Sequence, residues 1–141
     1  MKRSVAVLGA VALVALVGCS DSPTRPDGGP SQALIELIVQ TADAAPVAGA
    51  AASFALYLGE ACDGERVAEV DLVTDATGIA LTLLEAPPGI AGRVTCLSIG
   101  LLPPAGSDLQ QTQVEMPNLL LHHRDYVPSP PKVRIGVTME S

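Results

Sequence analysis

Short apolar segments separated by turn residues fill the chain from Ala33 onward, and this pattern constrains its fold more than any other feature. Several segments alternate with a period of two, so that Phe54, Leu56 and Leu58 share one face of an extended strand. Residues typical of turns lie between the segments, as in the Thr-Asp-Ala-Thr-Gly stretch at 74–78. The spacing favours an antiparallel β-sandwich over helices.

The predicted domain spans residues 33–141 and is all-β. A chain of this length fits one domain with a single core. The alanine-rich run at 48–52 contains good helix formers, but Pro46 and Gly49 argue against a helix there. We expect about seven strands, at 33–39, 53–58, 67–73, 79–84, 93–101, 109–116 and 132–139.

Aromatic side chains are scarce, because Phe54, Tyr57 and Tyr126 are the only ones in the chain. The core must therefore be built from Val, Leu, Ile and Ala. Sugar-binding platforms and base-stacking surfaces use aromatic faces, so their scarcity disfavours both kinds of site. Tyr57 or Tyr126 alone could still line a small site.

Two turn motifs carry a family resemblance. The stretch Asp-Ala-Ala-Pro-Val-Ala-Gly-Ala at 43–50, followed by Thr-Asp-Ala-Thr-Gly-Ile-Ala at 74–80, resembles the pattern of carboxypeptidase regulatory-like (transthyretin-like) and bacterial Ig-like domains. Pro88-Gly89, leading into Val-Thr-Cys at 94–96, continues it, and the resemblance covers about residues 34–101. It implies an Ig-like or prealbumin-like sandwich, typically an accessory, adhesive or structural module, and it transfers no catalytic residue.

An export signal precedes the predicted domain. Met1-Lys2-Arg3 supplies a positive start, and an apolar run of Val, Ala and Leu continues to Val17. The run is shorter than the ~20 apolar residues of a spanning helix, and polar residues follow from Ser20. We expect residues 1–18 to be a signal peptide that is removed.

The end of this signal, Leu16-Val17-Gly18-Cys19, resembles the lipobox of bacterial lipoproteins. The resemblance implies that the Cys19 thiol carries a diacylglycerol and becomes the first residue of the mature protein. In such lipoproteins an Asp directly after the lipidated Cys tends to retain the protein at the inner membrane. This chain has Ser20 at that position, which implies sorting to the outer membrane if the source is Gram-negative. An ordinary signal peptide with an incidental Cys is the alternative. The lipid is the only expected cofactor, and the membrane is the expected partner.

Residues 19–32 read as the lipidated Cys and a flexible tether. The stretch from Ser20 to Pro30 has no apolar side chain except proline, and about a dozen extended residues reach roughly 40 Å. Cleavage at Cys19 would remove Lys2 and Arg3 and leave 8 − 2 = 6 basic residues against 15 acidic ones, a charge of −9. This balance disfavours nucleic acid as a partner.

Cys62 and Cys96 remain as a pair once Cys19 is lipidated. An even number of thiols in an exported chain predicts a disulfide, with two free thiols or an intermolecular bond as alternatives. The spacing is not that of a Cys-x-x-Cys motif, and two thiols are half of a structural zinc site.

Other candidate sites are weak. His122 and His123 are adjacent, and neighbouring side chains on an extended chain point to opposite faces, so the pair is a poor metal site. The Gln-Gln-Thr-Gln segment at 110–113 predicts a polar edge strand that a partner could extend. A group of acidic residues could hold calcium only if their turns met in space, because no single loop has the ligand spacing of a calcium site. The group consists of Asp63, Glu65, Asp71 and Asp75.

No catalytic or metal-ligating residue is predicted, because the chain lacks a Gly-x-Ser-x-Gly elbow and a His-Glu-x-x-His helix. The sequence favours a lipid-anchored, non-enzymatic structural or interaction module of the cell envelope. A ligand-binding or envelope-complex assembly lipoprotein is the alternative, followed by a small hydrolase.

Overall fold

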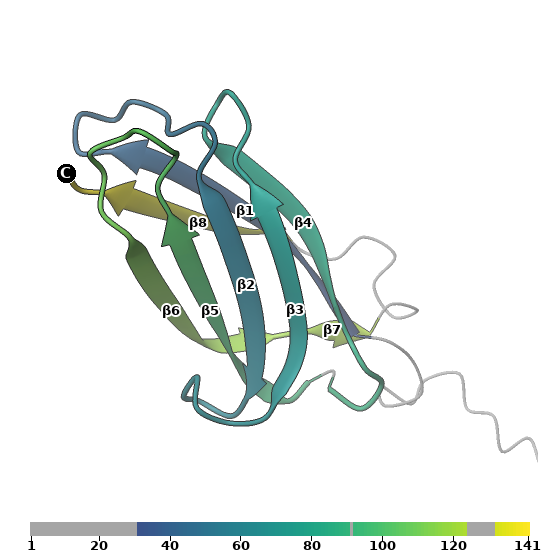
Figure 1. The fold of residues 1–141 in the computed structure, drawn as a ribbon. Coiled ribbons are helices and arrows are strands. Elements are labelled where there is room, and N and C mark those ends of the chain that lie inside the picture. The colour runs from purple at the N-terminus through teal and green to yellow at the C-terminus, as the bar shows by residue number, and fades with distance from the viewer. Residues whose placement is uncertain (1–30, 91, 124–131) are drawn as a thin grey trace, which may run out of the picture.

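The computed structural model describes residues 31–90, 92–123 and 132–141, and this part of the chain forms two layers of β-strands (Figure 1). Seven of its strands have eight residues or more, and one has two. In chain order they are β1 (Ser31–Thr41), β2 (Ala51–Leu58), β3 (Arg66–Val73), β4 (Ile79–Ala86), β5 (Val94–Leu102), β6 (Thr112–Leu120), β7 (His122–His123) and β8 (Lys132–Met139).

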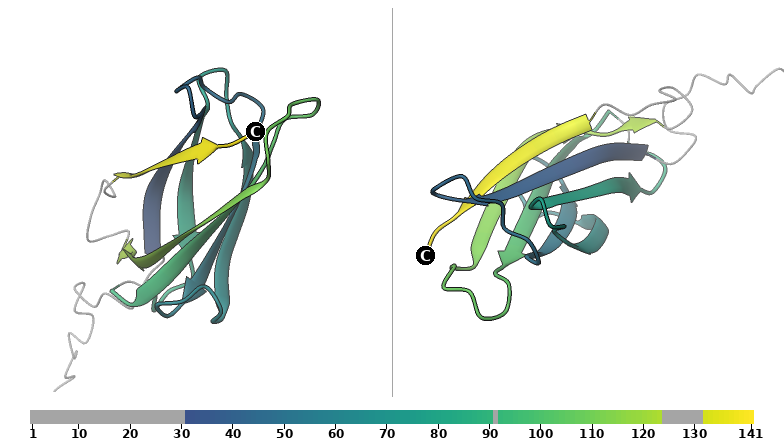
Figure 2. Two further views of the ribbon diagram at one scale, coloured as in Figure 1. Left: turned by 90° about the vertical axis from the view of Figure 1, so that its left-hand side faces the viewer. Right: turned by 90° about the horizontal axis from the view of Figure 1, so that it is seen from above.

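The strands are divided between two sheets. In sheet A, β1 is central, with β4 on one edge and both β7 and β8 on the other. In sheet B the order is β3-β2-β5-β6, and every pair is antiparallel. The side and end views separate the two layers (Figure 2). The predicted all-β sandwich of about seven strands is confirmed. Among the described residues, no helix has the length and apolar character needed to cross a membrane.

The core lies between the two sheets and is aliphatic, as the composition requires. Alternate residues of the central strands β1, β2 and β5 point into it and are buried, whereas those of the edge strand β3 are half-buried. Phe54 is completely buried, which confirms its predicted place on the core face. The largest fully buried side chains beside it include Ile35, Leu37, Leu56, Leu84, Leu97, Ile99, Leu101, Leu121 and Met139.

One strand pair contradicts the expectation of an entirely antiparallel sandwich, because β1 and β8 run parallel over Leu34–Thr41 and Lys132–Met139. The reason lies in β7, which pairs with Ser31 and Gln32 at the start of β1. The chain therefore re-enters sheet A at that end, where Lys132 is paired with Leu34. From there β8 can only run in the direction of β1.

Several strand boundaries differ from the prediction by one or two residues, and those of β1 and β6 differ with structural consequences. β1 begins at Ser31, inside the predicted tether, and both Ser31 and Gln32 are buried. The sixth strand runs from Thr112 to Leu120 and not from 109 to 116. Pro117 lies within β6, which is an edge strand, where a missing N–H is tolerated. A register shift opposite Thr95–Leu97 and the positive φ of Asn118 (59°) accommodate it.

Thr74 joins the two turn motifs at one end of the sandwich. Its hydroxyl donates to the Val47 carbonyl at 2.7 Å and accepts from the Ala50 N–H at 2.9 Å. Its backbone N–H and carbonyl bond to Ala50 and Gly49 respectively. Thr74 is only 4% exposed, so the hydrogen bonds of its hydroxyl are buried. The connection between β1 and β2 is thereby fixed to the turn between β3 and β4.

Gly78 completes this junction. Its φ is +75°, and a Cβ there would lie 2.4 Å from the Val39 carbonyl oxygen. A side chain at this position would therefore collide with the backbone of β1 and be strained in φ. The glycine of the Thr-Asp-Ala-Thr-Gly turn is a packing requirement as well as a turn residue.

Glu36 bridges the parallel strands on the outer face of sheet A. Its carboxylate accepts from Arg134 Nε and, at 3.3 Å, from Lys132 Nζ, while its side chain is 13% exposed. The hydrogen bond from Arg134 is the main cause that lowers the pKa of Glu36 below its ordinary value of 4.5, and the bond from Lys132 adds to it against an opposing desolvation.

Replacing Thr74 should destabilise the domain. Thr74→Val leaves the buried Ala50 N–H and Val47 carbonyl without a partner, and we expect a loss of roughly 1–3 kcal/mol in the free energy of unfolding. Urea denaturation measures it. Thr77→Val is the matched control, because the Thr77 hydroxyl bonds to Asp75 at an exposed site. Equal losses in the two variants would contradict the role assigned to Thr74.

Replacing Glu36 should make the stability less dependent on pH. The folded-state pKa of Glu36 is lowered, so its contribution is complete above about pH 4.5 and is lost as the pH falls below that value. Glu36→Gln should therefore melt at a lower temperature than the parent at pH 7, and the difference should shrink by about pH 3. The exposed pair Arg66–Glu69 supplies the control, Glu69→Gln, which should have a smaller effect.

Candidate interaction surfaces

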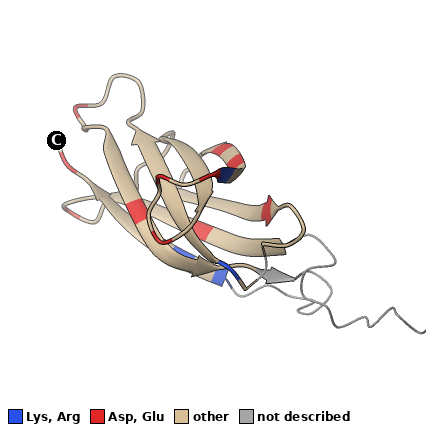
Figure 3. Ribbon diagram, turned by 90° about the horizontal axis from the view of Figure 1, so that it is seen from below, with Lys and Arg blue, Asp and Glu red and all other residues tan. Residues whose placement is uncertain are grey.

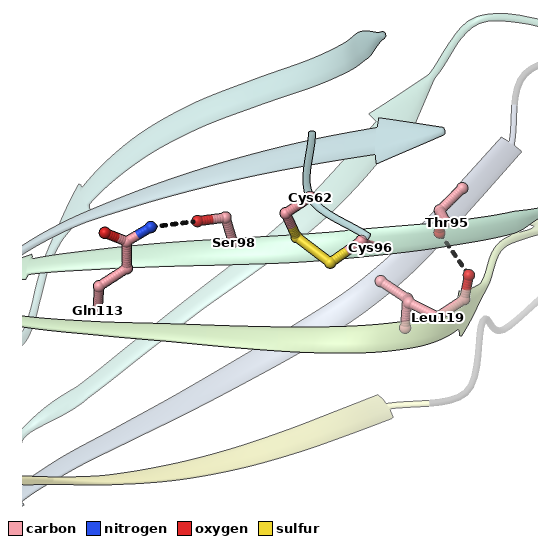
Figure 4. The surroundings of a disulfide bond; sticks show 6 residues. All are labelled: Cys62, Thr95, Cys96, Ser98, Gln113 and Leu119. Atoms are coloured by element: carbon pink, nitrogen blue, oxygen red, sulfur yellow. Dashed lines mark hydrogen bonds between the residues drawn. A yellow bond between two sulfur atoms is a disulfide. The ribbon is translucent and has the colours of Figure 1, made fainter. Parts of the chain in front are cut away.

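The predicted disulfide between Cys62 and Cys96 is present, with a Cα–Cα distance of 5.1 Å and a sequence separation of 34 (Figure 4). Cys62 lies in the connection between β2 and β3, and Cys96 lies in β5. Its neighbours Thr95 and Leu97 are fully buried and face the core, so Cys96 is on the outer face of sheet B. It is nevertheless only 1% exposed, which places it beneath the loop that carries Cys62.

The acidic residues considered for calcium do not converge. Asp63 and Glu65 precede β3, whereas Asp75 follows it, so the eight residues of β3 separate them by roughly 26 Å along the strand. Asp71 projects from β3 itself. Acidic residues are spread over several strands and loops (Figure 3). Within residues 31–90, 92–123 and 132–141, no group of three His, Cys, Asp or Glu side chains could hold a metal ion.

Asp75 has a structural role in its own turn. Its Oδ1 accepts hydrogen bonds from the Thr77 hydroxyl at 2.6 Å, the Thr77 N–H at 2.8 Å and the Ile79 N–H at 3.0 Å. The Thr77 hydroxyl is the largest cause that lowers the pKa of Asp75, followed by the two backbone bonds. The carboxylate is thus engaged in closing the turn between β3 and β4.

The histidine pair and the polar segment both lie at sheet edges. His122 and His123 form β7, whose backbone pairs with the first two residues of β1. Thr112 and Gln113 begin β6, which is an edge strand of sheet B, so an edge here is confirmed. Gln113 Nε2 donates to Ser98 Oγ at 3.3 Å. Gln110 and Gln111 precede the strand. Cys19, the rest of its lipobox at 16–18, and Tyr126 lie outside the described residues.

A shallow hollow lies on sheet B between β2 and β3. It is lined by Ala51, Ala52, Ser53, Asp71, Leu72 and Val73. Asp71 is its one ionisable side chain, so the hollow contains neither a carboxylate pair nor a carboxylate–histidine pair for acid–base chemistry. The hollow does not define an active site.

The most distinctive surface is the outer face of β4. Leu81 and Leu83 are 54% and 44% exposed, and both belong to the solvent side of sheet A. The register places Leu34 opposite Leu83, Glu36 opposite Leu81 and Ile38 opposite Ile79 on the same face. We call the five apolar residues of this set the β4 face. Contiguous apolar groups on a sheet surface mark interaction sites more often than isolated ones do.

The sequence reasoning missed the β4 face, although a signal was present. The segment from Ile79 to Leu84 is apolar on both of its faces except for Thr82. A strand with one solvated face alternates apolar and polar residues, whereas a strand covered on both faces is apolar throughout. This difference predicts that something covers the outer side of β4.

A comparison with models of protein families finds none that matches this chain, and a comparison with curated proteins finds no match either.

Loss of the disulfide should weaken the fold substantially. Cys62→Ser/Cys96→Ser frees a loop of 34 residues, and loop-closure entropy predicts a loss of about 4 kcal/mol in the free energy of unfolding. Guanidinium denaturation of the oxidised parent and the double variant measures this difference. A reducing agent should lower the stability of the parent and leave the double variant unchanged, and an effect on both would show that another group is being reduced.

Proposed function

We propose that this protein is a lipid-anchored β-sandwich of the bacterial cell envelope that acts as a non-enzymatic structural or interaction module. The anchor is the thiol of Cys19, placed by the lipobox at residues 16–19, and the sandwich is of the Ig-like or prealbumin-like kind. The contact that Thr74 makes with Val47 and Ala50 supports this family relation, because it joins the two motifs that carry the resemblance.

The disulfide supports the compartment. Structural disulfides persist in oxidising compartments and are rare where thiols are kept reduced. The bond between Cys62 and Cys96 therefore agrees with export of the chain by its amino-terminal signal. Ser20 favours sorting to the outer membrane of a Gram-negative cell.

The β4 face is the observation that carries the role as an interaction module. Leu81 and Leu83 expose apolar surface at positions where a purely structural spacer needs polar side chains. The five members of the face share one side of sheet A, and the carboxylate of Glu36, which lies opposite Leu81 on that side, is already bonded to Arg134 and Lys132. The geometry fits association with a macromolecular surface better than catalysis.

Lipid attachment can be tested with two cysteine variants, one of which should lose the lipid and keep the disulfide, and the other the reverse. We expect the parent to incorporate labelled fatty acid and to fractionate with membranes, and Cys19→Ser to lose both properties while it keeps the Cys62–Cys96 bond. Cys62→Ser is the control, which should keep the label and lose the bond. Two chains of buried acyl CH₂ groups, at ~0.8 kcal/mol each, make the membrane association effectively permanent. Labelling that survives in Cys19→Ser would refute the anchor.

A further inference from the structure

The β4 face is continuous, and it begins at the end of sheet A where the chain enters the domain. Leu34 and Leu83 form the pair nearest that end, because Leu34 is the fourth residue of β1 and so lies about 10 Å from its start. Leu81 follows on β4, and Ile38 and Ile79 form the farthest pair. The apolar area therefore extends along the strands from the tether side of the sheet.

The exposed apolar residues of sheet B are divided, in contrast. Val94 and Leu120 lie opposite each other at one end of the sheet, whereas Val73 and Leu102 both lie beside Ala51 at the other end. The length of β5 separates the two pairs by roughly 26 Å. Among the described residues, a continuous apolar area is thus a property of the outer face of sheet A.

The outer face of sheet B is also acidic. Glu69, Asp71 and Glu115 project from it between the two apolar pairs. Arg66, which is paired with Glu69, is the one basic residue in the four strands of this sheet. Three carboxylates against one guanidinium leave a net charge of 1 − 3 = −2. Anionic lipid headgroups repel a surface of this sign.

The outer face of sheet A has no such excess of negative charge. Lys132 and Arg134 of β8 lie beside the apolar residues, with Lys132 paired with Leu34, and they balance Glu36 and Glu85. Long basic side chains beside exposed leucines are typical of a protein surface that lies in a membrane interface, because the chain stems stay apolar while the charged ends reach the headgroups.

The chain between the anchor and the domain is short. Twelve residues, from Cys19 to Pro30, precede Ser31, so the domain starts no more than roughly 40 Å from the lipid. A short link of this kind gives two attached groups an effective concentration in the millimolar range. A weak contact between the domain and the membrane is therefore sufficient for the contact to form.

We propose that the β4 face lies against the lipid bilayer that holds the Cys19 anchor. Leu81 and Leu83 enter the boundary between headgroups and acyl chains, and Lys132 and Arg134 contact anionic headgroups. The acidic face of sheet B then points away from the membrane. This inference rests on the proposed lipid anchor and adds an orientation of the domain to it.

Spin labelling of the full, lipidated chain in vesicles of equal amounts of phosphatidylcholine and phosphatidylglycerol tests the contact. The thiol in Leu83→Cys is the only free one, because Cys19 carries the lipid and Cys62 is bonded to Cys96. We expect a nitroxide there to be roughly fivefold less accessible to a water-soluble nickel chelate than one in Val73→Cys, since the chelate is excluded from the acyl boundary. Val73 is the matched control because it is an exposed apolar residue of sheet B.

Flotation of the same vesicles separates this inference from the proposed anchor. A chain that does not float with the vesicles would overturn the anchor and the inference together. A chain that floats, but whose two labelled positions are equally accessible, would overturn the inference and leave the anchor standing. Protection at position 83 that disappears when the protein is diluted in the membrane would show a contact between copies, and the inference would be wrong.

A charge placed on the β4 face should release it from the membrane. In the chain labelled at position 83, Leu81→Asp should raise the accessibility to that of the label at position 73, because a carboxylate is repelled by anionic headgroups. Val73→Asp in the same labelled chain should leave position 83 protected. An intact disulfide and an unchanged melting temperature show that both variants are folded. Equal protection in the two variants would contradict the contact.

Discussion

The hydroxyl of Thr74 is the interaction on which the arrangement of the sandwich depends. It satisfies the Val47 carbonyl and the Ala50 N–H inside the protein, where an unpaired polar group is costly. By doing so it fixes the start of β2 to the end of β3, while Gly78 lets β1 pass close to the same turn. Both sheets are thereby held at one end, and the Cys62–Cys96 bond holds the loop at the other end of β2 and β3 against β5.

Much of this fold could be predicted from the sequence, because the features concerned are local. Short apolar segments separated by turn residues located the seven longer strands, and an even pair of thiols after an export signal predicted the disulfide. The direction of β8 could not be predicted, since alternation is the same in parallel and antiparallel strands. The end of the sixth strand could not be predicted for a related reason, because a strand accommodates a proline such as Pro117 where it lies at an edge, which is a property of the whole sheet.

The candidate surface was harder to predict than the fold. Leu81 and Leu83 are ordinary strand residues until the topology is known, and their place on the outer face of sheet A makes them exposed, whereas Ala80 and Leu84 of the same strand are buried. Asp75, one of the acidic residues considered for calcium, has a structural role instead, as does Glu36. Asp75 closes a turn, and Glu36 joins β1 to β8 through Arg134 and Lys132. The surface is therefore defined by apolar area and backbone geometry, and not by reactive groups.

The parallel pairing of β1 and β8 has a mechanical consequence. The start of β1 and the end of β8 lie at opposite ends of this ladder (Figure 1). A pulling force that enters through Ser31 and leaves after Met139 acts along the strands in shear, so the eight residue pairs share the load and do not separate one after another. A domain pulled between its two ends would resist extension at the strand pair where the sequence and the structure disagreed.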